Sequence, residues 1–200
     1  MRIRLAGAGL IALGVGAALA AMAIVAASEG SVRIGGLGYW LAIGAVALLG
    51  AGVWLIAIDQ PIVPGTLARR GLKFLGLGLI SEAVLLGVST LPAFQGINGV
   101  ILFFPIFAAT WSIIIGAGLT TLALLQAGGR SRRIGAAFLS APLAFFAGNT
   151  LIYNIAGPSG APVAQVLDVV AGVAVLIGFL GLAWLSVEPA ALAVQPRHGS

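Results

Sequence analysis

The chain contains no cysteine and only one histidine, so several kinds of chemistry are excluded at the outset. Without cysteine there are no disulfides, thiolate metal sites, iron–sulfur clusters or cysteine nucleophiles. His198 lies next to the C-terminus, which argues against a histidine-held haem, zinc or iron centre. We therefore expect no cofactor and no metal.

Catalytic signatures are missing as well. The sequence has no HExxH, no GxSxG, no Walker or dinucleotide fingerprint and no paired aspartates within its apolar segments. An enzyme that acts on lipid therefore has no motif in its favour, and we expect a protein that is not an enzyme.

Charge is also scarce. Only 8% of the 200 residues are charged, against about a quarter in soluble domains, and 60% are hydrophobic. The mean hydropathy is +1.16. A soluble fold of this size could not bury so much apolar surface. The 30 glycines suit close helix packing in lipid. The composition predicts an all-α, polytopic transmembrane helix bundle that forms one integral membrane domain over residues 1–200.

Six apolar segments are long enough to span a bilayer, which takes about 20 residues each. They cover about 5–27, 36–58, 71–91, 99–126, 134–154 and 163–187. Pro105 is expected to kink the fourth. A cleaved signal peptide is the alternative for the first, because Arg2 and Arg4 precede an apolar stretch with Ala21-Met22-Ala23. That stretch is longer than a usual signal-peptide core, so we expect a retained span.

The basic residues indicate orientation. If six spans alternate, Arg33 alone falls on one side and the other nine basic residues fall on the opposite side. The positive-inside rule then places both termini in the cytoplasm. Because the basic residues flank apolar segments, we expect no nucleic-acid partner. The abundance of Ala, Gly and Arg suggests a prokaryotic source and therefore the cytoplasmic membrane.

Small residues recur every seven positions, which returns them to nearly the same helix face. This spacing predicts faces for close helix neighbours, with packing inside the bundle favoured over a partner-binding face. The repeats are Gly7, Gly14 and Ala21; Gly9, Gly16 and Ala23; and Gly71 with Gly78.

Glu82 lies near the middle of the third predicted span. An ionised carboxylate at this depth is costly, and no Lys or Arg lies mid-span to pair with it, so we expect a neutral, hydrogen-bonded acid that faces the bundle interior. The candidate partners are the hydroxyls of the fourth span, Thr110 and Ser112 nearest in depth and Thr120 and Thr121 beyond them. Glu82 is a candidate proton- or cation-binding residue, and the alternative is a structural acid satisfied by its neighbours.

A second polar group is expected at the outer end of the last two spans. It could form a polar vestibule, although an interfacial belt that caps helix ends is the favoured interpretation. Its members are Asn149, Tyr153, Asn154, Gln165 and Asp168. Among the tryptophans, Trp111 is nearest mid-span and is expected to pack inside.

Two functions remain open. The first is a non-enzymatic accessory or assembly subunit of a membrane complex, favoured by sparse polar chemistry, short loops and smooth small-residue faces. The alternative is a small transporter or channel-like protein that uses Glu82 as a protonatable site. The expected partners are the lipid bilayer and either other membrane subunits or further copies of the chain.

Overall fold

A computed structural model describes residues 2–28, 35–59, 65–91, 99–146 and 161–188, and these residues form an all-helical protein. The six helices in this part of the chain are α1 (Arg2–Ala27), α2 (Leu37–Asp59), α3 (Thr66–Ser89), α4 (Gly99–Ala127), α5 (Gly129–Phe146) and α7 (Ala161–Val187). Five of them are long and apolar enough to cross a membrane. The exception is α5, which has 18 residues and carries three arginines.

Three helices begin earlier than predicted where the difference falls on arginines. The first is α1, which begins at Arg2 rather than at residue 5. We expected the segment around Arg130, Arg132 and Arg133 to interrupt the helices, but these residues lie at the start of α5. Only Gly128 separates α4 from α5, and the turn uses positive φ angles of 74° at Gly128 and 53° at the next glycine, which glycine adopts without steric cost. Similarly, α3 begins at Thr66 rather than at residue 71.

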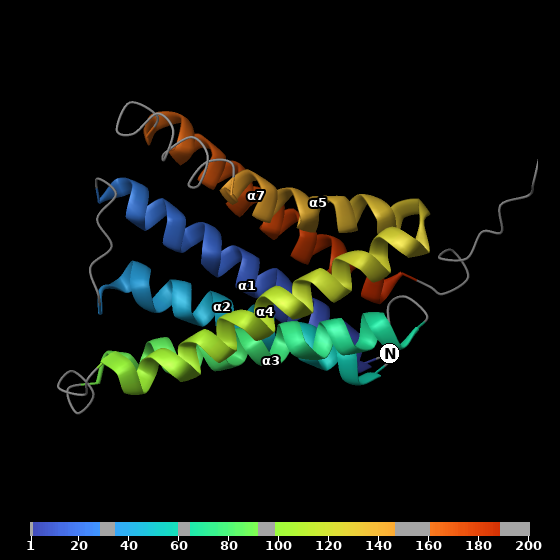
Figure 1. Cartoon of the computed structure of the whole chain (residues 1–200), viewed down its shortest axis with the longest axis horizontal. Coiled ribbons are helices and arrows are strands. Elements are labelled where there is room, and N and C mark those ends of the chain that lie inside the picture. Colours follow the sequence, from blue (N-terminus) through green and yellow to red (C-terminus); the bar gives the residue numbers. More distant parts are fainter. Residues whose placement is uncertain (1, 29–34, 60–64, 92–98, 147–160, 189–200) are drawn as a thin grey trace, which may run out of the picture.

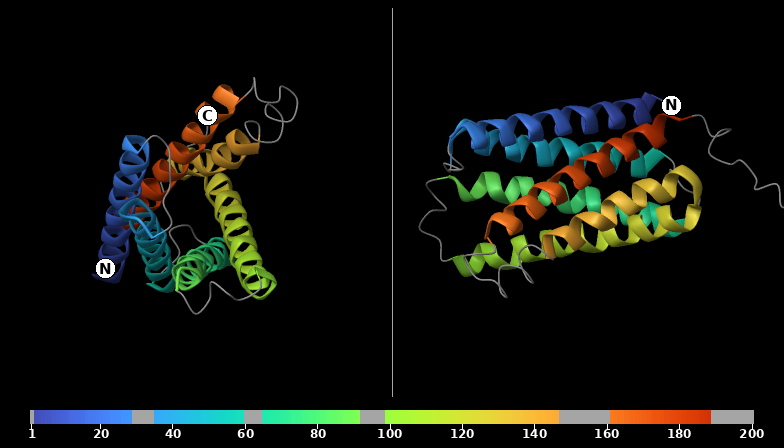
Figure 2. Two further views of the ribbon diagram at one scale, coloured as in Figure 1. Left: turned by 90° about the vertical axis from the view of Figure 1, so that its left-hand side faces the viewer. Right: turned by 90° about the horizontal axis from the view of Figure 1, so that it is seen from above.

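The helices form a closed ring. Each helix packs against the next described helix along the chain, and α7 returns to pack against α1 (Figures 1 and 2). Consecutive helices run in opposite directions (Figure 1). The starts of α1, α3 and α5 therefore meet the ends of α2, α4 and α7 at one end of the ring, on the right in Figure 1.

This end, which we call the basic end, carries every basic residue within the described ranges. They are Arg2, Arg4, Arg69, Arg70, Lys73, Arg130, Arg132 and Arg133. The opposite end is called the distal end. Arg33 and Arg197 lie outside the described residues.

Large buried side chains lie in the half of the ring nearer the basic end. They come from every helix and include Ile11, Val53, Leu75, Leu124, Phe138 and Leu182. We take the distal half as the part of the ring beyond Val15 on α1, Leu49 on α2 and Leu79 on α3. The buried residues of the described chain in this half are all alanine or glycine: Ala21, Gly38, Ala45, Ala83, Ala109, Ala141 and Ala171. The helices therefore touch through small residues in the distal half and share a core of large residues only in the other half.

Distal residues with large apolar side chains are correspondingly exposed on this chain. Phe104 on α4 is 67% exposed and Val166 on α7 is 62% exposed. Trp111, which we expected to pack inside, is 47% exposed, and its ring packs edge-to-face with that of Phe107 on the same helix, with 5.8 Å between the ring centroids. The α4 helix continues through Pro105.

One of the two small-residue faces of α1 is a packing face. Gly7, Gly14 and Ala21 are buried, and a Cβ on Gly7 would lie 2.9 Å from the carbonyl oxygen of Gly52 on α2. Gly9 and Gly16 have no atom within 4 Å of a corresponding Cβ. The seven-residue repeat thus predicted the helix contact on one face, and the second face stays open on the described chain.

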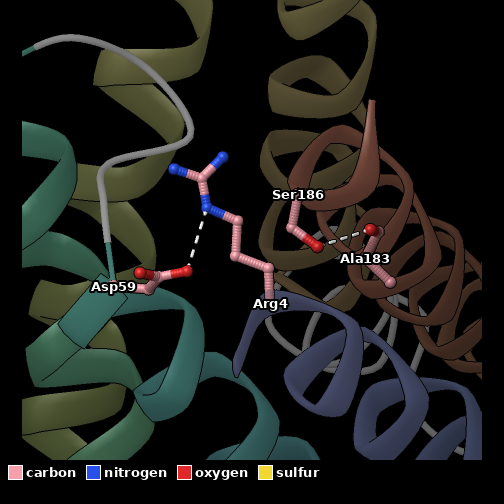
Figure 3. Close-up of polar contacts among 4 residues, drawn as sticks. All are labelled: Arg4, Asp59, Ala183 and Ser186. Carbon is pink, nitrogen blue, oxygen red and sulfur yellow. Dashed lines mark hydrogen bonds and ion pairs between the residues drawn. The ribbon is translucent and has the colours of Figure 1, made fainter. Parts of the chain in front are cut away.

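Ion pairs join helices at the basic end. Arg4 Nε on α1 lies 3.3 Å from Asp59 Oδ2 at the end of α2, beside the last turn of α7 where Ser186 donates to the carbonyl of Ala183 (Figure 3). Arg130 on α5 donates to Glu188 Oε1 at 2.6 Å, immediately after α7.

Candidate functional site

The interface between α3 and α4 is an antiparallel series of small-to-large contacts. A Cβ on Gly71 would lie 2.6 Å from the backbone nitrogen of Thr120, and a Cβ on Gly78 would lie 2.8 Å from that of Ile113. The absence of side chains at these glycines lets the two helix backbones approach closely.

Glu82 makes the next contact along the α3–α4 interface after Gly71 and Gly78. It follows Gly78 by four residues and so lies on the same face of α3. Its partner across the interface is Thr110, one of the hydroxyls expected from the sequence, and the Oγ1–Oε2 distance is 3.4 Å. The close contact between α3 and α4 therefore sets the position of the carboxyl group.

Glu82 is far from every positive charge of its own helix. Lys73 is the nearest basic residue along α3, and nine residues of helix separate the two by about 14 Å along the axis. The Glu82 side chain is half-buried, and Thr110 is exposed on this chain. The pair thus lies in the distal half, at an edge of the α3–α4 contact rather than inside the core of large side chains.

Thr110 can serve both protonation states of Glu82. Its hydroxyl has one hydrogen and two acceptor lone pairs, and Oγ1 lies 3.0 Å from the carbonyl oxygen of Ile106. When the hydroxyl donates to Ile106, its oxygen can accept from a protonated Glu82. When Glu82 is ionised, the hydroxyl can donate to Oε2 instead. A hydroxyl with this property is compatible with a carboxyl group that accepts and releases a proton.

The other candidate hydroxyls of α4 do not reach Glu82. Ser112 donates to the carbonyl of Ala108 at 2.9 Å. Thr120 and Thr121 are buried nearer the basic end, and Thr120 Oγ1 has no hydrogen-bond partner among the described residues. Thr120 Oγ1 lies instead close to Gly71, 2.7 Å from where a Cβ would stand. Thr120 is therefore part of the helix contact.

The predicted vestibule falls mostly outside the described residues. Asn149, Tyr153 and Asn154 belong to the stretch that the structure leaves undescribed. Gln165 and Asp168 lie three residues apart near the start of α7, where Gln165 is exposed and Asp168 is half-buried. Within the described ranges, no group of three or more His, Cys, Asp or Glu side chains converges to hold a metal ion.

Sequence reasoning did not anticipate the polar contacts at the basic end. Besides its ion pair with Glu188, the Arg130 guanidinium lies 5.1 Å from the centre of the Trp184 ring, and the Glu188 side chain is only 7% exposed. The available signal was that acids and arginines at the ends of neighbouring helices lie at one end of the bundle, as Arg4 and Asp59 also do.

Comparison with known proteins gives no relative for this chain: no family model, no curated protein and no solved structure matches it. The interpretation of its function therefore depends on its own residues.

Proposed function

We propose that the chain is a non-enzymatic subunit of a membrane complex. In this proposal it spans the cytoplasmic membrane of a prokaryotic cell six times, with both termini in the cytoplasm, and packs against another membrane-embedded chain. The apolar helices support the membrane location. The basic end supports the orientation, because positive residues favour the cytoplasmic side.

The observation that carries the subunit proposal is the distribution of large apolar side chains. In the distal half, the described helices bury only alanine and glycine and leave residues such as Phe104 and Val166 exposed. The half-exposed Glu82 and its partner Thr110 lie in the same half, and a polar pair at this depth is costly against lipid. A second protein chain would cover both the apolar and the polar groups.

Site-directed crosslinking tests this proposal, and the absence of cysteine gives a clean background. A photoreactive maleimide is attached to Val166→Cys in the distal half of α7 or to Leu180→Cys nearer the basic end, both in native membranes at natural expression level. Leu180 is also exposed, at 44%, and serves as the matched control.

We expect Val166→Cys to crosslink in high yield to one other membrane protein, different from this chain. We expect Leu180→Cys to crosslink to lipid. Lipid adducts alone at both positions would contradict the subunit proposal. Crosslinking between two copies of the chain would show a homo-oligomer instead of a second protein, and it would also contradict the subunit proposal.

The orientation is tested with single cysteines and a membrane-impermeant maleimide on intact cells. Five positions alternate along the chain between the distal and basic ends: Ser28, Thr66, Leu91, Gln126 and Gln165. We expect Ser28→Cys, Leu91→Cys and Gln165→Cys to react from outside, and the other two to react only after lysis. Reaction of Thr66→Cys or Gln126→Cys in intact cells would contradict cytoplasmic termini.

A second candidate function is proton-coupled transport, and the Glu82–Thr110 pair favours it because Thr110 suits both states of the acid. In proteoliposomes, Glu82→Gln should abolish a proton flux and Thr110→Val should reduce it. Ser112→Ala is the control, because that hydroxyl bonds only to its own helix. An unchanged flux in Glu82→Gln would remove this candidate.

A further inference from the structure

The basic end has more positive charge than the chain itself neutralises. Within the described ranges it carries eight basic residues and two acids, Asp59 and Glu188. Asp59 pairs with Arg4, and Glu188 pairs with Arg130. Arg69, Arg70 and Lys73 on the first turns of α3 make no ion pair with any described residue.

The start of α3 reinforces this positive charge. Its first turn has no acidic residue, and Gly65 before it offers no side chain to the free backbone N–H groups. These N–H groups carry the positive end of the helix dipole, and Arg69 and Arg70 add full charges there. An anion at this position would be attracted by both.

The same face of α3 continues as an apolar surface. Arg70, Phe74 and Leu77 are spaced by four and three residues and so lie above one another along the helix. All three are exposed, with Phe74 at 44% and Leu77 at 48%. The face thus has a cationic top and an apolar stem, which is the arrangement that complements a phosphate headgroup with an attached acyl chain.

We propose that this face of α3 binds an anionic phospholipid of the leaflet at the basic end. Arg69, Arg70 and Lys73 hold its phosphate, and Phe74 and Leu77 contact its acyl chain. The inference needs the membrane location alone, and it stands whether the chain is a subunit or a transporter.

The test is native mass spectrometry of the purified full chain in a nonionic detergent, titrated with phosphatidylglycerol or phosphatidylcholine. Each cation near a phosphate strengthens binding by about fivefold. We therefore expect Arg69→Gln/Arg70→Gln to weaken phosphatidylglycerol binding by about thirtyfold. The matched control is Arg132→Gln/Arg133→Gln, which removes the same charge from exposed positions of α5. It should leave phosphatidylglycerol binding at the α3 site unchanged.

Two further variants distinguish a loss of lipid binding from a loss of folding. Arg69→Lys/Arg70→Lys keeps both charges and should bind phosphatidylglycerol as the unmodified chain does. Lys73→Gln alone should weaken binding by about fivefold.

Three results would overturn the proposal. Equal weakening by the α3 and α5 glutamine variants would show diffuse charge attraction. Equal affinity for phosphatidylcholine would show that the cations do not select the lipid. Displacement of the lipid by inorganic phosphate would show that the apolar stem contributes nothing.

Discussion

Replacing Gly116 by alanine should push α3 and α4 apart. A Cβ at this position would meet the backbone of α3, with the Cα of Leu75 at 2.6 Å and the carbonyl carbon of Phe74 at 2.8 Å. Real Cβ atoms essentially never lie so close to another heavy atom, and a backbone cannot rotate away as a side chain can. The strain must therefore be relieved by moving the helices.

The magnitude follows from two opposing effects. Overpacking costs about 1–3 kcal/mol, and contact with backbone atoms places this site at the upper end of that range. Alanine also stabilises a helix by about 1 kcal/mol relative to glycine. We expect Gly116→Ala to lower the free energy of unfolding by about 2 kcal/mol, which corresponds to a fall in melting temperature of about 4–8 °C.

Gly118 on the same helix provides the matched control, because a Cβ there has no atom within 4 Å. Gly118→Ala should therefore stabilise the protein by up to about 1 kcal/mol. Unfolding of both variants in mixed detergent micelles, followed by circular dichroism, measures the difference of about 3 kcal/mol. Equal stabilities of the two variants would refute the close approach of α3 and α4.

Two further predictions concern the basic end. In a double-mutant cycle, Arg4→Gln and Asp59→Asn should show a coupling energy of about 1 kcal/mol, because the two side chains are 3.3 Å apart and each is 24% exposed. Additive effects of the two substitutions would mean that the ion pair contributes nothing to stability. Arg130→Lys keeps the charge but weakens the cation–π contact with Trp184, so it should cost about 1 kcal/mol more in a chain that retains Trp184 than in a Trp184→Leu background. The same loss in both backgrounds would contradict the cation–π contact.

The helical architecture could be predicted from the sequence because lipid forces apolar segments to satisfy their own backbone hydrogen bonds. The predicted ranges 36–58 and 99–126 agree closely with α2 and α4. The predicted starts of α1, α3 and α5 were wrong because we assigned arginines to loops. Long Arg and Lys side chains can reach the membrane surface from inside a helix, so a charge at a span end does not stop the helix.

The partner of Glu82 was partly predictable. Depth alone selected Thr110 and Ser112, and only the register of α3 against α4 distinguishes them. That register depends on which glycines meet the neighbouring backbone, and Gly9 and Gly16 show that an equal spacing can produce no contact. The separation of large and small buried residues between the two halves of the ring could not be predicted from the sequence either, because it depends on how all six described helices pack together.

The most direct test of the subunit proposal is native mass spectrometry of the protein gently extracted from its own cells at natural expression level. The proposal predicts a complex in which this chain and at least one other membrane protein occur in a fixed ratio. A lone chain, or a complex made only of copies of this chain, would contradict it.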